Sequence, residues 1–178
     1  KTIMSKTRLI QALVTCTRHQ KILLGRWNKG PFQGHVSGMI GETAEGQSPE
    51  EAASYLCRAL SGLDVSPSMF ARRAFFTFHE VDASHPAAKE LGVDYQELQL
   101  VCDVDDHAMF TPTSSTLFSP LGWIPFKDIP YDEMPEDDAI WYPRVLTSDA
   151  ILEGEFKFDG TKLLSSDVRE VSWDNFGA

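Results

Sequence analysis

The feature that most constrains this fold is a helix with both ends marked in the sequence. Ser48 is a good N-cap, Pro49 occupies the first helical position, and Glu51 follows the cap by three residues, which completes a capping box. The helix therefore begins after Ser48 and runs to about Ser61, where Gly62 is a natural C-terminal stop. The stretch before it is rich in glycine, which lets the backbone turn sharply or approach a ligand closely.

Apolar runs typical of strands lie on both sides of this helix. Residues 9–15 and 21–24 predict the two halves of a hairpin, and residues 74–81 and 97–104 predict further strands. The rest of the chain is predicted as a loop or short helix over 82–95, a loop over 109–121, structure from 123 to 126, a second helix over 137–152, and strands at 156–158 and 167–171. This order predicts an α/β (α+β) fold with a mixed β-sheet between helices.

Charge and cysteine content exclude some classes of partner. The net charge of −10 disfavours binding to a nucleic-acid backbone, which requires a basic surface. No apolar run approaches the length that spans a membrane. Three scattered cysteines indicate reduced core thiols, so we expect an intracellular protein, cytoplasmic first, with a mitochondrial or other organellar location left open.

The segment from Gly41 to Leu63 resembles a Nudix box. That box reads G-x5-E-x7-R-E-U-x-E-E-x-G-U, where U is aliphatic, and Gly41, Gly62 and Leu63 stand at the required spacing. The glycine-rich loop and the capped helix also match the loop–helix–loop form of the motif. This resemblance implies the Nudix fold.

Later stretches are similar to the MutT-homologue branch of that superfamily, which hydrolyses oxidised purine nucleoside triphosphates. Residues 124–128 and 136–143 resemble the base-recognition region, residues 154–158 and 168–171 resemble the closing strands, and 22–25 fits an early strand. The resemblance implies one Nudix domain over residues 8–173. We expect residues 1–7 to be a flexible or added N-terminal segment and residues 174–178 to be a C-terminal tail.

The ionisable members of the signature are missing. In the family, glutamates on one helix face hold the magnesium ions that activate water, and an arginine orients a glutamate. The corresponding positions here carry Gln47, Tyr55, Leu56, Ala59 and Leu60. The histidines show no ligand-like spacing with the cysteines either. We therefore expect no catalytic residues of the family type, no metal site and no cofactor.

One alternative keeps the enzyme active. Four acidic residues cluster just before and within the first helical turn, and displaced carboxylates could hold magnesium: Glu42, Glu45, Glu50 and Glu51. The structural interpretation is favoured, because Glu50 and Glu51 suit the helix N-terminus and the other two suit a solvated loop.

The base-binding end of the family's pocket is partly retained. Asp137, Asp138 and Trp141 stand where the resemblance places paired aspartates and a stacking tryptophan. Phe76 and Phe78 match aromatic residues on the pocket strand, and Ser37 replaces a pocket asparagine. Alternatively, the two aspartates cap the following helix and Trp141 belongs to the core. If base binding is retained, the ligand is a purine nucleotide.

The altered helix face permits a second kind of partner. Leu56, Ala59, Leu60 and Leu63 form a continuous apolar stripe where the family has a water-filled cleft. Residues 82–95, the loop 111–120, another protein or a second copy of this chain would have to cover it. The sequence thus predicts a catalytically inactive Nudix-like protein that acts in binding, regulation or assembly, with an active pyrophosphohydrolase as the alternative.

Overall fold

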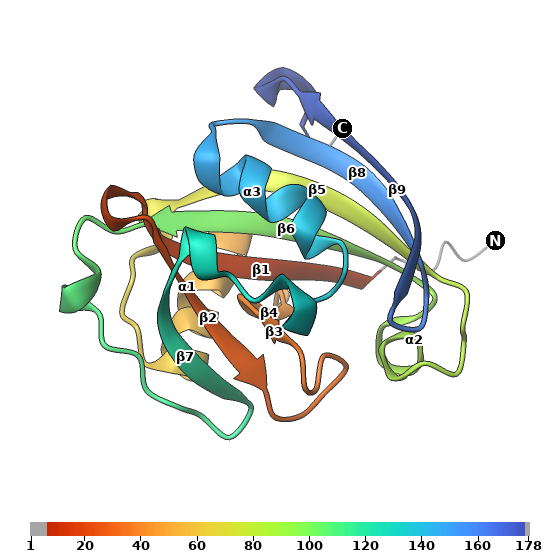
Figure 1. The fold of residues 1–178 in the computed structure, drawn as a ribbon, viewed down its shortest axis with the longest axis horizontal. Coiled ribbons are helices and arrows are strands. Elements are labelled where there is room, and N and C mark those ends of the chain that lie inside the picture. The colour runs from red at the N-terminus through yellow and green to blue at the C-terminus, as the bar shows by residue number, and fades with distance from the viewer. Residues whose placement is uncertain (1–6, 177–178) are drawn as a thin grey trace.

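In the computed structural model, residues 7–176 form a mixed β-sheet with helices on both faces, as predicted (Figure 1). The strands are β1 (Thr7–Cys16), β2 (Lys21–Trp27), β3 (Val36–Ser37), β4 (Met39–Glu42), β5 (Phe70–Glu80), β6 (Asp94–Asp103), β7 (Phe118–Pro125), β8 (Ile151–Asp159) and β9 (Lys162–Val171). The α-helices are α1 (Pro49–Ser61), α2 (Pro86–Leu91) and α3 (Asp138–Thr147). The predicted segments beyond residues 8–173 fall partly outside this described range.

The sheet runs in the order β3-β2-β1-β6-β5-β8-β9, with β4 also paired to β1 and β7 to β2. Two of the pairings are parallel, β1 with β6 and β5 with β8, and the others are antiparallel. The expected hairpin of residues 9–15 and 21–24 pairs only beside its turn, at Thr15–Ile22 and Cys16–Lys21. Further from the turn, β1 pairs with β4 instead.

The first predicted helix is confirmed at both ends. Ser48 accepts a hydrogen bond from the Glu51 amide at 3.1 Å, and the Glu51 carboxylate accepts one from the Ser48 amide at 2.9 Å. Gly62 ends α1 in the left-handed region, with φ of 70°. Local capping signals and tertiary packing agree here, which is why the sequence locates this helix so well.

The second predicted helix is shorter than its pattern indicated. It ends at Thr147 rather than residue 152, and β8 begins at Ile151. Leu152 pairs in parallel with Ala74 of β5, so pairing with the sheet overrides the local preference. Likewise, the predicted loop 109–121 ends in the first residues of β7, and the segment 82–95 contains the short helix α2.

The three cysteines are free thiols and all of them are buried, as expected of core residues. Within residues 7–176, no helix combines the length and apolar character needed to cross a membrane.

Candidate functional site

A pocket opens where the β8–β9 turn and α2 approach the N-terminal end of α3 (Figure 1). Its cavity volume is about 70 Å³, and the empty space out to the open mouth is about 710 Å³. The structure brings four of the six predicted base-binding residues to its wall: Ser37, Phe78, Asp137 and Asp138.

The two aspartates lie at the start of α3 and are both 3% exposed. The Asp137 side chain does not cap the helix; its Oδ2 accepts a hydrogen bond from the Trp141 indole at 2.9 Å. Asp138 Oδ2 is buried and has no hydrogen-bond partner. A buried polar atom without a partner is costly, so this oxygen is a candidate ligand contact.

A second polar layer lies beneath the aspartates. Glu97 Oε1 accepts hydrogen bonds from the side-chain amides of Gln11 at 2.9 Å and Gln99 at 2.7 Å. Gln11 Oε1 accepts from the Tyr142 hydroxyl at 2.8 Å and from the Gly38 amide at 3.0 Å. This network fixes the floor of the pocket across β1, β6 and α3.

Burial favours the protonated forms of the carboxyl groups at the floor of the pocket. It raises the pKa of Glu97 to about 7 and also raises the pKa of Asp137. Burial, with repulsion from Asp137 and Glu97, raises the pKa of Asp138 well above its usual range. Three such neighbours are not all ionised at neutral pH. The raised pKa of Asp138 favours its protonated form, which can donate a hydrogen bond, whereas Asp137 accepts one from Trp141.

Aromatic rings form one wall. Phe78 stacks on Tyr95 with ring centroids 5.0 Å apart and planes at 10°, and both rings line the pocket. Ser37 also lines it, but its hydroxyl donates to the Gly38 carbonyl and accepts from Trp27.

Phe76 and Trp141 do not line the pocket. Both are 0% exposed and pack against each other in the core, with ring centroids 5.3 Å apart. Stacking of Trp141 on a base, which the sequence predicted, does not fit this placement. Trp141 acts on the pocket through its hydrogen bond to Asp137 instead.

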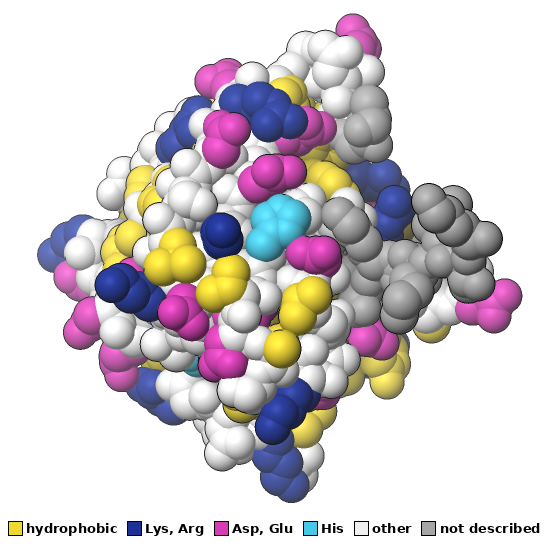
Figure 2. Space-filling model, turned by 90° about the vertical axis from the view of Figure 1, so that its right-hand side faces the viewer, with side chains coloured by type: hydrophobic (Ala, Val, Ile, Leu, Met, Phe, Trp, Pro, Cys, Tyr) yellow, Lys and Arg dark blue, Asp and Glu magenta, His cyan; other side chains and the backbone are white. Residues whose placement is uncertain are grey.

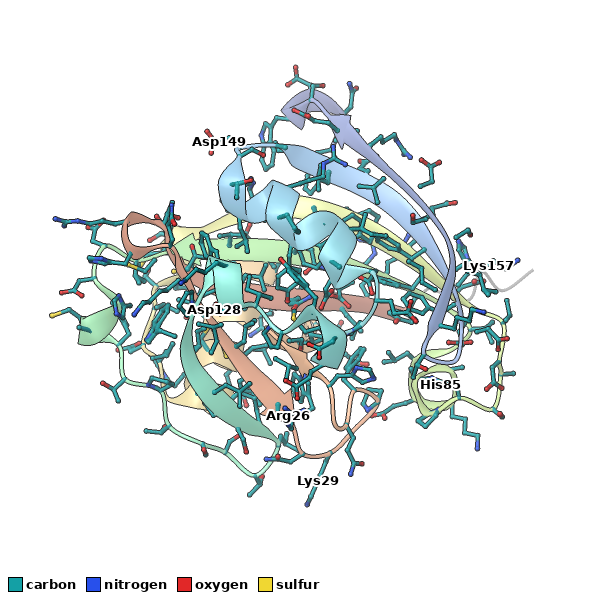
Figure 3. All side chains as sticks on the ribbon, viewed as in Figure 1. Arg26, Lys29, His85, Asp128, Asp149 and Lys157 are labelled. Carbon is teal, nitrogen blue, oxygen red and sulfur yellow. The ribbon has the colours of Figure 1, made fainter. Side chains whose placement is uncertain are left out.

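Histidines surround the mouth. His35, His79 and His85 line it, and burial followed by repulsion from His85 lowers the pKa of His35. Figure 2, viewed from this side, shows acidic, basic and hydrophobic side chains intermixed around an exposed histidine. Figure 3 places His85 at α2. Among residues 7–176, none of those that line the pocket is lysine or arginine, so this part of the wall offers a phosphate chain no permanent cation.

The helix face that carries the Nudix signature positions does not fit magnesium. Leu60 is buried in the core, and Leu56 is partly buried against Gly41, where an added Cβ would lie 2.6 Å from a Leu56 methyl. Ala59 and Tyr55 are exposed, and Gln47 accepts from the Ala44 amide. These side chains present no carboxylate to a cation.

This packing also corrects the predicted interface. The chain's own core covers Leu60 and much of Leu56, so of the three interface candidates only Ala59 is fully exposed. The loop after η3, a 3₁₀ turn at His107–Met109, reaches the end of the helix, where the Thr113 amide donates to the Ser61 carbonyl at 2.8 Å. Most of the apolar stripe is thus internal packing.

The four glutamates considered as displaced magnesium ligands either have structural partners or lie exposed to solvent. Glu50 forms an ion pair with Arg72 at 2.7 Å, and Glu51 completes the capping box. Glu42 and Glu45 are exposed, and none of the four belongs to a group of potential metal ligands among residues 7–176.

The pocket floor was missed at the sequence level. Gln11, Glu97 and Gln99 are polar residues within apolar strands, and that interruption was the available signal. A polar side chain that points from a strand into the protein core requires a hydrogen-bond partner. Polar positions within apolar strands therefore indicate buried hydrogen-bond networks.

Comparisons with known proteins agree with the fold. No family model matches the chain. It is 31% identical over 169 residues to the oxidized purine nucleoside triphosphate hydrolase of Mus musculus, covering 94% of this chain and 98% of the mouse protein.

Solved structures share the architecture at lower identity. A MutT protein from Bacillus halodurans superposes with a TM-score of 0.72 at 18% identity, over 91% of this chain and 97% of its own. A bifunctional NMN adenylyltransferase/ADP ribose pyrophosphatase from Francisella tularensis gives 0.62 at 14% identity, over 82% of this chain and 42% of its own.

Proposed function

Because this chain belongs to the Nudix superfamily as a MutT-like homologue of the oxidised purine nucleoside triphosphate hydrolases, we propose that it binds a purine nucleotide without cleaving it. The observation that carries the proposal is the Asp137–Asp138 pair at the pocket floor, where Asp138 Oδ2 is buried and lacks a partner. The mouse homologue is named for oxidised purine nucleoside triphosphates, and the ligand class proposed for this chain is a purine nucleotide, oxidised or ordinary.

The base end of the pocket suits a purine edge. A purine edge presents donors and acceptors side by side, and a protonated Asp138 beside an acceptor Asp137 offers the complementary pair. The ring of Phe78 provides an apolar wall next to them.

The phosphate end argues against hydrolysis. Cleavage of a pyrophosphate linkage needs divalent cations to neutralise charge and activate water. Leu56, Ala59 and Leu60 replace the carboxylates that would hold them, and the described residues of the pocket wall include no lysine or arginine. The protein therefore acts as a binding or regulatory member of its superfamily.

Calorimetric titration with oxidised and ordinary purine nucleoside mono- and triphosphates tests the proposal. Asp138→Ala removes the donor and should weaken binding at least about tenfold. Asp138→Asn retains a donor and an acceptor, so its affinity should stay near the wild-type value. The exposed Asp128 provides the matched control, and Asp128→Ala should bind like the wild type.

Hydrolysis is measured in parallel as pyrophosphate release with magnesium. No release above the protein-free rate is expected. Turnover that disappears on alanine substitution at Glu42, Glu45, Glu50 or Glu51 would support the active alternative. Unchanged affinity in a folded Asp138→Ala protein would refute base binding at this pocket.

A further inference from the structure

We propose that Cys16, His19 and His107 form a binding site for a zinc-class divalent ion. One potential ligand atom from each lies within 4.8 Å of the other two, the only such group of three or more among residues 7–176. Reasoning from sequence spacing had found no ligand set here, because His107 lies far along the chain from the other two.

The first two ligands come from one tight turn. Cys16 ends β1, and His19 closes the 3₁₀ turn η1 (Thr17–His19), so the two are three residues apart. In a 3₁₀ helix, side chains at that spacing lie on the same side. Gln20 then leaves the turn with φ of 52°, in a region that non-glycine residues seldom adopt.

A neighbouring strand fixes the turn in place. Asp103 Oδ1, at the end of β6, accepts hydrogen bonds at 2.8 Å from the Thr15 hydroxyl, the Thr17 amide and the Thr17 hydroxyl. Cys16 and His19 are thereby held against the segment that follows β6. Pre-positioned ligands reduce the ordering cost of binding an ion.

The third ligand comes from that segment. His107 begins the 3₁₀ turn η3, and its ring lies edge-on to His19 with centroids 5.2 Å apart. His107 Nδ1 is buried and has no hydrogen-bond partner. A ring nitrogen removed from water without a partner indicates a missing interaction, which a metal ion would supply.

The donor set indicates the class of ion. A thiolate with two imidazoles is typical of zinc and similar transition ions, whereas magnesium and calcium require oxygen ligands. Binding would release the Cys16 thiol proton to solvent and replace its present weak bond to the Asp105 carbonyl at 3.6 Å. Three protein ligands leave the fourth tetrahedral position to water.

One neighbouring positive charge disfavours the binding of a cation at this site. The Lys21 ammonium lies 3.5 Å from His107 Nε2. Its flexible side chain is half-buried and can turn toward water when an ion binds. Lys21→Gln should therefore tighten binding several-fold.

The location separates this site from the pocket. The β1–β2 turn lies at the opposite end of the sheet from α2 and the β8–β9 turn (Figure 1). A bound ion would link the β1–β2 turn to the η3 segment. It would therefore stabilise the end of the sheet at which the β1–β2 turn lies.

Cobalt titration of the whole protein under reducing conditions tests the site. Co²⁺ bound by a thiolate gives a sulfur-to-metal charge-transfer band, and Zn²⁺ should displace it. Cys16→Ser should abolish the band, and His19→Ala and His107→Ala should each weaken binding at least about tenfold. Because His19 is exposed, its alanine variant should fold normally.

Two controls match the residue types elsewhere in the fold. Cys57→Ala removes another buried cysteine and His79→Ala another histidine, and both should leave cobalt binding unchanged. Zinc should also raise the midpoint of thermal unfolding in the wild type and not in His19→Ala. Absence of the band, its survival in Cys16→Ser, or unchanged affinity in His19→Ala or in Lys21→Gln would overturn the three-ligand site.

Discussion

At the scale of single residues, the protein has three acidic side chains that are almost completely buried at the wall of its pocket. Glu97, Asp137 and Asp138 are 4%, 3% and 3% exposed, and they face the same small volume. Burying ionised groups destabilises a fold unless the charges are paired or neutralised. Three buried carboxyl groups in one place therefore cost stability, unless they are neutral or find hydrogen-bond partners.

The raised pKa of Glu97 predicts a dependence of stability on pH. An unfolded glutamate titrates near pH ~4.3, whereas burial raises the pKa of Glu97 to about 7. Between these values the folded state binds more protons than the unfolded state, so the free energy of unfolding falls as pH rises through this window. Urea unfolding at about pH 5 and about pH 7.5 should differ by roughly 2.5 kcal/mol from this group alone.

Glu97→Gln tests that assignment, because the amide keeps an acceptor for Gln11 and Gln99 and never ionises. The variant should lose less stability across the window than the wild type. Glu155→Gln, at an exposed position on β8, should retain the wild-type slope. A wild-type protein with equal stability at both pH values would contradict the argument.

Several residue roles could be predicted from the sequence and others could not. Asp137 and Asp138 were found through the resemblance, and they line the pocket. Trp141 was predicted at the ligand and lies in the core, because sequence similarity gives position along the chain and says little about which side of a helix is covered. The meeting of Cys16 with His107 depends on β1 pairing with β6, which no local pattern reveals.

At the scale of elements, α1 is attached to the rest of the fold by one buried side. Its buried side consists of Ala52, Ala53, Cys57, Leu60 and Ser61, and Leu63 is buried just beyond it. Burial of apolar surface at these positions stabilises the helix against the sheet. The same side chains leave no place for hydrated cations.

Two substitutions that return glutamate to family positions should differ sharply. Leu60→Glu places a carboxylate in the core and should lower the free energy of unfolding by at least about 3 kcal/mol. Ala59→Glu lies on the exposed side and should change it by less than about 0.5 kcal/mol. Chemical unfolding of both variants provides the measurement, and equal stability of Leu60→Glu and the wild type would mean that this side of α1 is open to water.

Elements with local end signals were predicted better than those defined by partners. The capping box located α1 at both ends, whereas the second helix was extended across residues that belong to β8. β8 pairs in parallel with β5, which lies far earlier in the sequence. Hydrophobic periodicity and secondary-structure propensity are properties of one segment, so they cannot predict which distant strand it pairs with.

At the scale of the whole molecule, charge opposes polyphosphate ligands. Asp and Glu number 26 against 16 Lys and Arg, and the pocket wall has no lysine or arginine within the part of the chain that the structure describes. A long phosphate chain therefore approaches an acidic protein without a fixed cation to receive it. The mixed sheet and its helices, by contrast, were predicted correctly, because the order of elements and the family resemblance agreed.

Affinity should accordingly fall as phosphates are added. At about pH 8, a purine nucleoside monophosphate should bind at least as tightly as the triphosphate. Adding salt screens the repulsion, so it should strengthen triphosphate binding and leave the uncharged nucleoside unaffected. Calorimetry at two salt concentrations measures this, and tighter triphosphate binding at low salt would contradict it.

The hydrogen bond from Trp141 to Asp137 also gives the pocket an intrinsic fluorescent probe. The indole is fully buried and contacts the carboxylate that a ligand would share. Its emission intensity and wavelength therefore depend on the charge and bonding of that carboxylate. Trp173, which follows β9 and is 58% exposed, supplies a solvent-facing reference, so occupancy could be followed by intrinsic fluorescence without attaching a dye.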